Sequence, residues 1–202
     1  MSNSVCFREF EERDAESIYK WKNDKKLNSM IVGHFHPITY EEALLWVKGC
    51  MGHHEEYVFW AICTNDDKKR IVGWAALAKI DKINQSASTH SIVIADPDYN
   101  DGTAWLETEI YMFYYAFEVL KLNRIYGISL VGHKISNQVG ELMFMQVEGI
   151  LRQACYKNGR FYDLQYVGLL KDEYFAHKAA GDYELMAIIR RLKKLRKTKN
   201  NE

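Results

Sequence analysis

A polar turn between a strand-like run and a helix-like run is the part of this chain best suited to chemistry. The apolar run His90–Ile94 precedes it, and apolar residues recur at helical spacing after it, at Leu106, Ile110, Phe113, Phe117 and Leu120. Where a helix begins, several backbone N–H groups point at one place, and the positive end of the helix dipole lies behind them. The turn is therefore a candidate site for an anion such as a pyrophosphate, and the alternative is an ordinary strand-to-helix loop. The candidate contacts are Asn100, Asp101, Gly102, Thr103, Ala104 and Trp105.

Length and composition favour a single folded domain. The chain has 202 residues, of which 48% are hydrophobic, and its two prolines mark no linker. No run approaches the roughly 18 apolar residues of a membrane span, and the first ten residues lack the pattern of a signal peptide. Four cysteines lie far apart without a CxxC spacing, which is typical of reduced thiols in a cytoplasmic protein.

The net charge of zero is unevenly distributed. Residues 190–202 carry seven Lys or Arg and one Glu, so this tail is +6 and the rest of the chain is −6. An acidic body argues against a nucleic-acid surface there and favours an amine-bearing ligand. The segment Tyr183–Lys199 reads as a basic amphipathic helix that packs on the body or a second copy, or contacts RNA or an anionic membrane.

The order of the expected elements indicates a mixed α/β fold. The helix after Pro37 begins with a capping box formed by Thr39 and Glu42, and Asn158-Gly159 is the strongest hairpin signal. Strands are expected at 5–10, 57–63, 70–78, 90–94, 125–131, 149–156 and 161–170, and helices at 14–24, from Thr39, at 105–120, at 134–145 and at 183–199.

This order, together with several short motifs, resembles the GNAT N-acetyltransferases, which take acetyl-CoA. The motifs are Tyr115-Ala-Phe117 with Leu122-Asn-Arg124, then Glu148-Gly-Ile-Leu-Arg152, Tyr156-Lys-Asn-Gly-Arg160 and Gly168-Leu-Leu170. They are similar to the branch that holds ribosomal-protein N-terminal and nucleotide-amino-sugar acetyltransferases. The resemblance covers about residues 5–175. It implies a GNAT-like fold, with a central mixed sheet flanked by helices and a hairpin at the end.

The resemblance implies where acetyl-CoA binds. The backbone of Val93, Ile94 and Ala95 is expected to pair with the pantetheine arm, and residues 100–105 are expected to hold the pyrophosphate. In relatives this turn carries an Arg and three glycines, whereas here Asn100 stands at the Arg position and only Gly102 remains. His133 stands where relatives carry an Asn beside the CoA.

Relatives also carry a tyrosine that protonates the departing thiolate. At that position this chain has Gly140, or Phe144 if the match is shifted by four residues. A thiol has a pKa near 8.5, so it leaves without much help, and loss of a general acid costs at most about 10²–10⁴ in rate. Tyr111, Tyr156 and Tyr162 are the alternative phenols, and the sequence does not choose among them.

The attacking amine must lose a proton, and His90 is the candidate base. It stands near the place where many relatives carry a Glu, and an imidazole with a pKa near 6.5 accepts a proton directly or through water. The alternative is a half-buried strand histidine that hydrogen-bonds to a neighbour. His133 is expected to contact the CoA or solvent rather than to act as the base.

In the resembling family the acceptor docks on residues 22–57. Trp21, Asn23 and Phe35 are therefore the candidate substrate contacts, since an aromatic ring stacks on a sugar or base. Four histidines also lie there, at positions 34, 36, 53 and 54, without an HxxxH or HExxH spacing. We expect no metal site.

The sequence thus predicts a GNAT acetyltransferase over residues 1–178 and a basic tail over residues 179–202. The acceptor is expected to be a primary amine of an amino sugar, free or nucleotide-linked, or a protein N-terminus. A homodimer is a further possibility, and nucleic acid or membrane is expected to contact only the tail. The alternative function is a catalytically weak GNAT-fold binding protein whose tail contacts RNA, ribosome or membrane.

Overall fold

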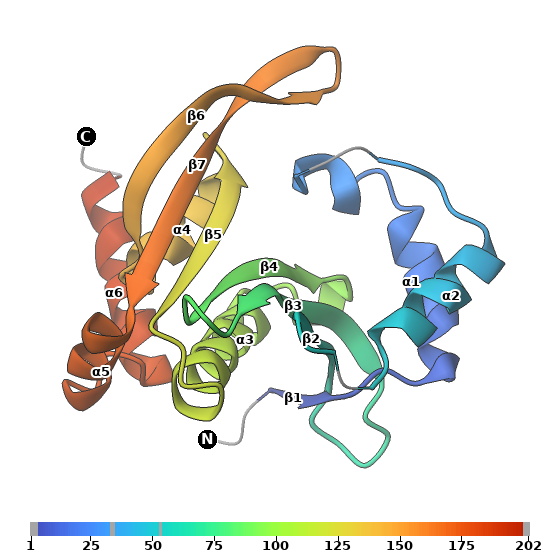
Figure 1. The fold of residues 1–202 in the computed structure, drawn as a ribbon, viewed down its shortest axis with the longest axis horizontal. Coiled ribbons are helices and arrows are strands. Elements are labelled where there is room, and N and C mark those ends of the chain that lie inside the picture. The colour runs from blue at the N-terminus through green and yellow to red at the C-terminus, as the bar shows by residue number, and fades with distance from the viewer. Residues whose placement is uncertain (1–3, 33–34, 53, 200–202) are drawn as a thin grey trace.

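The described residues form a seven-stranded sheet in the order β1-β2-β3-β4-β5-β7-β6 (Figure 1). The computed structural model describes residues 4–32, 35–52 and 54–199, and only the backbone of Met30, His90, Lys134, Ile135 and residues 195–199. Strand β4 pairs with β5 in parallel, and every other pairing is antiparallel. The strands are β1 (Val5–Arg8), β2 (Tyr57–Thr64), β3 (Ile71–Asp81), β4 (Ser86–Ile94), β5 (Arg124–Leu130), β6 (Gln146–Lys157) and β7 (Arg160–Leu170).

Helices cover both faces of this sheet. The α-helices are α1 (Ala15–Lys22), α2 (Tyr40–Cys50), α3 (Thr103–Tyr114), α4 (Lys134–Leu142), α5 (Lys171–Ala179) and α6 (Leu185–Lys199). Short 3-10 turns are η1 (Glu12–Asp14), η2 (Leu27–Met30) and η3 (Pro97–Tyr99), and α3 continues into a π-helical turn, η4 (Tyr115–Val119). The mixed sheet, its flanking helices, the final hairpin and the C-terminal helix expected from the sequence are confirmed.

Two hydrophobic clusters hold the layers together. The larger joins the sheet to α3, α4 and α6, with Phe113 and Phe117 fully buried in it. The second joins the opposite face to α1 and α2 through Ile18 and Val47. Because successive residues of a strand face opposite sides, Ala61 packs in one cluster and Ile62 in the other.

Local signals confirm several element boundaries. Thr39 accepts a hydrogen bond from Glu42 N–H at 3.2 Å while the Glu42 carboxylate accepts one from Thr39 N–H at 2.7 Å, which completes the expected capping box. Asn158 and Gly159 have φ of 52° and 79° in the turn between β6 and β7, as the Asn-Gly pair predicts.

Other boundaries differ from the sequence prediction. Strand β4 begins at Ser86 rather than His90, because Ser86–Ser88 pairs with β5 although it carries little apolar signal. Helix α3 begins at Thr103, two residues earlier than predicted, and α5 was not predicted at all. Asp14 does not cap α1 with its side chain; its carboxylate accepts from Arg8 and from Glu11 N–H instead.

The C-terminal helix is packed onto the rest of the chain. Ile188 is fully buried in the larger cluster, and Tyr183 Oη donates to Met143 O at 3.4 Å. Arg191 donates to Leu142 O at 3.2 Å, so α6 and the preceding turn supply partners for carbonyl groups at the end of α4. The expected amphipathic helix is therefore present, and its apolar stripe completes the core.

Candidate functional site

Strands β4 and β5 separate after a short stretch of parallel pairing. The pairing joins Ser86–Ser88 to Arg124–Tyr126, and Thr89 Oγ1 donates to Tyr126 O at 3.3 Å. Beyond this point, β4 pairs only with β3 in the part of the chain that the structure describes. The β4 edge that faces β5 thus presents backbone groups to a gap, where an extended ligand can bind as an added strand.

A β-bulge lies in β4 where this gap begins. Ala76 pairs with Ser91 and Leu77 pairs with Thr89, so His90 is the extra residue of β4. A bulge bends the strand that carries it, which contributes to the separation of β4 from β5. The backbone of His90 therefore lies at the gap, but its side chain is outside the described part of the chain, and its role as base stays a prediction.

Only one of the three residues expected to pair with pantetheine faces the gap. Ala95 N–H donates to Val72 O at 2.9 Å, and a Cβ added to Gly73 would lie 2.1 Å from Val93 O. Val93 and Ala95 therefore turn their backbone groups toward β3. Since alternate residues turn theirs to opposite sides, Ile94 is the residue whose N–H and C=O face the gap.

Helix α3 begins directly after this strand. Its N-cap is Gly102, which has a φ of 94° and makes no side-chain cap, and nothing lies within 4 Å of a Cβ added there. Among the described residues, the N–H groups of Ala104 and Trp105 have no hydrogen-bond partner. Free N–H groups in the first turn of a helix suit a diphosphate.

Asp101 changes the charge of this helix start. Its Oδ1 accepts from Thr103 N–H at 2.8 Å, and its Oδ2 accepts from Thr103 Oγ1 at 3.2 Å. Asn100 brings no charge, and its N–H donates to Pro97 O at 3.2 Å. The residues fit a CoA pyrophosphate through backbone N–H groups, with the Asp101 carboxylate as a competing acceptor beside them.

Two buried polar groups one turn apart on α3 were not anticipated from the sequence. Trp105 Nε1 and Glu109 Oε2 are buried, and neither has a hydrogen-bond partner among the described residues. Burial raises the pKa of Glu109 to about 7, because a carboxylate loses its hydration there. The spacing of apolar residues carries no signal for such a carboxyl group.

His133 is the N-cap of α4. Its Nδ1 accepts a hydrogen bond from Ser136 N–H at 3.1 Å, so Nδ1 carries no proton and the ring proton is on Nε2. Burial also lowers the pKa of His133. The ring is therefore neutral and can donate from Nε2 at the end of β5, as the expected CoA contact requires.

Neither expected position supplies a phenol. A Cβ added to Gly140 would meet nothing within 4 Å, so the space there is open. Phe144 stacks on His177 of α5, with ring centroids 3.6 Å apart. The departing thiolate must therefore obtain its proton from another group or from water.

The alternative phenols lie elsewhere in the fold. Tyr111 stacks on Phe7 with ring centroids 4.1 Å apart, at the β1 edge of the sheet and three strands from β4. This position is too far from the gap for a proton donor. Tyr156 and Tyr162 lie on the β6–β7 hairpin, where the Tyr162 hydroxyl accepts a hydrogen bond from Arg160 Nε.

Two of the expected acceptor contacts, Trp21 and Asn23, pack against other parts of the protein at the end of α1. Trp21 stacks on Trp74 with centroids 6.1 Å apart. Asn23 Nδ2 donates to Tyr19 O at 2.8 Å and to Ile38 O at 3.0 Å, and its Oδ1 accepts from Ile38 N–H at 3.0 Å. Both amide protons of Asn23 are thus used within the protein, and its role as a substrate contact stays a prediction.

The tip of the β6–β7 hairpin contacts the chain just before Phe35. Figure 1 shows the hairpin extending past β5 toward the α1–α2 connection. Lys157, only 7% exposed, donates from Nζ to Asn28 O at 3.0 Å and to Ile31 O at 2.5 Å. Phe35 is partly exposed nearby in sequence. The sequence predicted the turn at this tip but carried no signal for the contact.

No group of three His, Cys, Asp or Glu side chains that could hold a metal occurs among the described residues. Of the histidines considered for such a site, His34 and His53 lie outside the described residues. His36 is exposed, and His54 Nε2 lies 3.1 Å from Met51 O.

Comparison with known proteins identifies the class to which this fold and site belong. The sequence model of the acetyltransferase (GNAT) domain matches residues 4–143. The uncharacterized N-acetyltransferase YoaA of Bacillus subtilis is 24% identical over 173 residues, which is 84% of this chain and 95% of that protein. The putative ribosomal N-acetyltransferase YdaF of the same organism is 42% identical over 64 residues, which is 32% of this chain and 35% of that protein.

Solved structures support the same fold. The spermidine N-acetyltransferase from Vibrio cholerae in complex with CoA and spermine aligns with a TM-score of 0.75 and 22% identity, over 85% of this chain and 98% of that chain. A GNAT-family acetyltransferase from Bacillus anthracis aligns with a TM-score of 0.71 and 21% identity, over 86% and 98%. At these identities the likeness concerns the fold.

The chain belongs to the GNAT acetyltransferase family. It is an N-acetyltransferase that uses acetyl-CoA as cosubstrate, and the resemblance seen in the sequence is confirmed. Among the described residues, no helix has both the length and the apolar character needed to span a membrane.

Proposed function

We propose that this protein acetylates the primary amine of a small molecule by direct attack in a ternary complex. The observation that carries the proposal is the gap between β4 and β5, which opens beside the N-terminus of α3. An extended ligand arm against Ile94 and a phosphate group against Ala104 and Trp105 would both be held by backbone groups.

Residues of this chain have distinct roles in the proposal. Acetyl-CoA, when bound, supplies the acetyl group as a thioester. Ile94 orients the ligand arm, and the first turn of α3 neutralises phosphate charge. His133 donates a hydrogen bond from Nε2 at the end of β5, and His90, at the bulge, takes the proton from the attacking amine.

The acceptor belongs to the small-molecule class in this proposal, with an amino sugar, free or nucleotide-linked, as the first candidate. The Lys157 contact with the η2 segment supports this class, since it connects the hairpin to the α1–α2 connection on the side expected to take the acceptor. A protein N-terminus is the alternative, and the neighbour from Vibrio cholerae is a spermidine acetyltransferase.

A panel of amines tests the acceptor. Release of the CoA thiol is measured with a nucleotide-linked amino sugar, a free amino sugar, spermidine and a peptide with a free N-terminus. We expect the highest kcat/KM with an amino sugar. A peptide turned over better than every small amine would overturn the proposed class.

The pH dependence of the rate tests the base. His90→Asn should remove the acidic limb of the kcat/KM profile and lower the rate by about 10²–10⁴. The matched control is His133→Asn, because an Asn keeps the α4 N-cap; it should leave the apparent pKa in place. If the acidic limb of the profile is unchanged in His90→Asn, another residue is the base.

A catalytically weak binding protein is the second candidate. The Asp101 carboxylate at the helix start and the missing phenol favour it. Deletion of residues 179–202 cannot test the basic tail cleanly, because Tyr183 and Ile188 are core residues. Charge reversal at the exposed Arg190 and Lys193 is the better test: loss of an RNA, ribosome or membrane contact, with a low rate of acetylation that does not change, would favour this candidate.

We further propose that residues 1–178 form the acetyltransferase domain and that residues 179–202 form a basic extension packed on it. In this proposal the protein is a homodimer in the cytoplasm. The free thiols of Cys6, Cys50, Cys63 and Cys155 support the location, because reduced thiols are the rule in that compartment.

A further inference from the structure

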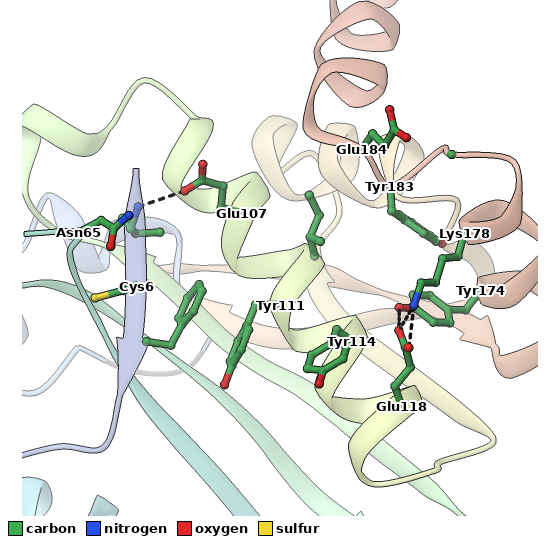
Figure 2. A pocket seen from close by; sticks show the side chains of 14 residues that line it. Cys6, Asn65, Glu107, Tyr111, Tyr114, Glu118, Tyr174, Lys178, Tyr183 and Glu184 are labelled. Atoms are coloured by element: carbon green, nitrogen blue, oxygen red, sulfur yellow. Dashed lines mark hydrogen bonds and ion pairs between the residues drawn. The ribbon is translucent and has the colours of Figure 1, made fainter. Parts of the chain in front are cut away.

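A second hollow lies far from the β4–β5 gap. A groove of about 880 Å³ runs along α3 between β1 and the turn from α5 to α6. Figure 2 shows the side chains that line it. We call it the α3 groove and define it by Phe7, Tyr111, Tyr114, Glu118 and Glu184. It borders β1, three strands from β4 in the sheet, so it is separate from the proposed acetyl-CoA site. Its volume is in the range of small-molecule sites.

The side of α3 that lines this groove has an unusual composition. Glu107, Ile110, Tyr111, Tyr114 and Glu118 recur at intervals of three or four residues, so they share one side of the helix. A solvent-facing helix side is normally polar. Here its centre is apolar and aromatic, and Tyr114 is 45% exposed.

Aromatic rings also form both walls. On the β1 side, Phe7 stacks on Tyr111, with centroids 4.1 Å apart and planes 8° from parallel. On the α5 side, Tyr174 and Tyr183 stack with centroids 5.2 Å apart. Faces of aromatic rings carry negative charge density and attract organic cations.

The charged residues of the groove are mostly acidic. Among the described residues that line it, the carboxylates are Glu107, Glu118 and Glu184, and the only basic side chain is Lys178. Glu107 accepts hydrogen bonds from neutral donors, the N–H and Oγ of Ser4 and the N–H of Val5. Lys178 Nζ donates to both Glu118 oxygens at 2.6 Å, so its charge is already matched. The remaining charge of the groove is negative, which favours a cation and opposes an anion.

Glu118 occupies a special backbone position. The turn Tyr115–Val119 is π-helical, and such turns occur frequently at functional sites. In this turn the Glu118 carboxylate accepts from Tyr174 Oη at 2.5 Å and from Lys178 of α5. The distortion thus places the ion pair of Glu118 and Lys178 at the end of the groove opposite Glu107.

We propose that the α3 groove binds an elongated organic cation, an aliphatic chain with an ammonium group at each end. The eleven residues from Glu107 to Glu118 span about 16 Å at the rise of a helix, which sets the length of the ligand. The methylene chain lies on Tyr111 and Tyr114, and the ammonium groups lie in the field of Glu107 and Glu184. This inference does not depend on the identity of the acetyl acceptor.

Calorimetric titration of the full chain with diaminodecane tests the proposal. We expect saturable binding, and we expect the neutral decanediol not to bind. Tyr114→Ser should weaken binding of the diamine about five- to tenfold, through loss of a ring face, and Glu184→Gln about threefold. Affinity for acetyl-CoA should be unchanged in both variants.

The matched control is Tyr40→Ser on α2. Tyr40 is 44% exposed, nearly the same as Tyr114, and lies outside the groove, so this change should leave the affinity for the diamine unaltered. Three results would overturn the proposal: no binding at millimolar diamine, equal binding of the diol, or full affinity in Tyr114→Ser. If diamine binding is lost in Tyr40→Ser but kept in Tyr114→Ser, the diamine binds at the acceptor side and not in the α3 groove.

Discussion

The carboxylate of Asp101 accepts the N–H of Thr103 at 2.8 Å, at the start of the helix expected to bind phosphate. An acidic cap stabilises a helix N-terminus in the absence of ligand. The same charge repels a diphosphate that approaches the neighbouring N–H groups of Ala104 and Trp105. A cofactor bound at the proposed site would therefore meet a local opposing charge, which lowers its affinity.

Removal of that charge should strengthen cofactor binding. Asp101→Asn keeps a capping side chain and removes the carboxylate, so we expect the Kd for CoA to fall about threefold to tenfold. Asp98→Asn is the control, because Asp98 is exposed and makes no contact with the first turn of α3. Weaker CoA binding in Asp101→Asn would show that the carboxylate helps to hold the cofactor.

Glu109 should make stability depend on pH. Its pKa is raised to about 7 in the folded state from 4.5, so its destabilising effect is absent below about pH 4.5, grows as pH rises, and is complete above pH 7. Glu109→Gln should therefore raise Tm by several degrees at pH 8 and little at pH 5. Glu184→Gln, an exposed control, should shift Tm at neither pH. An equal gain at both pH values would exclude burial of charge as the cause.

The Lys157 bridge should affect the acceptor more than the cofactor. Lys157→Met removes two charge-assisted hydrogen bonds to Asn28 O and Ile31 O, each worth about 1.5–3 kcal/mol. We expect KM for the acceptor to rise several-fold and KM for acetyl-CoA to stay constant. Arg160→Met is the matched control, because Arg160 pairs with Lys157 across the hairpin and its side chain lies on Tyr162. Equal effects of the two variants would argue against the bridge.

At position 144, a Gly variant should be more stable than an Ala variant, which is the reverse of the usual order. Its φ is 62°, which costs about 1–2 kcal/mol for a residue with a Cβ. Stacking on His177 at 3.6 Å and on the Arg191 guanidinium at 4.5 Å stabilises it there. Both Phe144→Ala and Phe144→Gly should lower the free energy of unfolding in urea, with Gly more stable than Ala by about 1 kcal/mol. The opposite order would mean that the backbone relaxes when the ring is removed.

Much of the fold follows from short-range patterns. The Thr39–Glu42 capping box and the Asn158-Gly159 turn depend on groups three or fewer residues apart, so the sequence predicts them directly. The helical spacing of Leu106, Phe113 and Phe117 likewise places α3 against the sheet. Strand β4 was predicted only in part, because Ser86–Ser88 is held by β5 rather than by its own apolar pattern.

The candidate site depends more on contacts between distant parts of the chain. The turn before α3 could be recognised because a helix start exposes N–H groups in any sequence. The orientation of Ile94 toward the gap, the proton on Nε2 of His133 and the use of Asn23 within the protein are set by their neighbours. Packing of distant parts of the chain determines these neighbours, and no local sequence pattern predicts it.

The sequence by itself determined the family, the order of the elements and the location of the helix start, because each depends on residues close together in the chain. Only the tertiary structure decided that Lys157 meets Ile31 and that Phe7 meets Tyr111. It also decided that Glu109 Oε2 is buried with no hydrogen-bond partner among the described residues. The reason is that burial and long-range contact depend on how the sheet brings separate helices together.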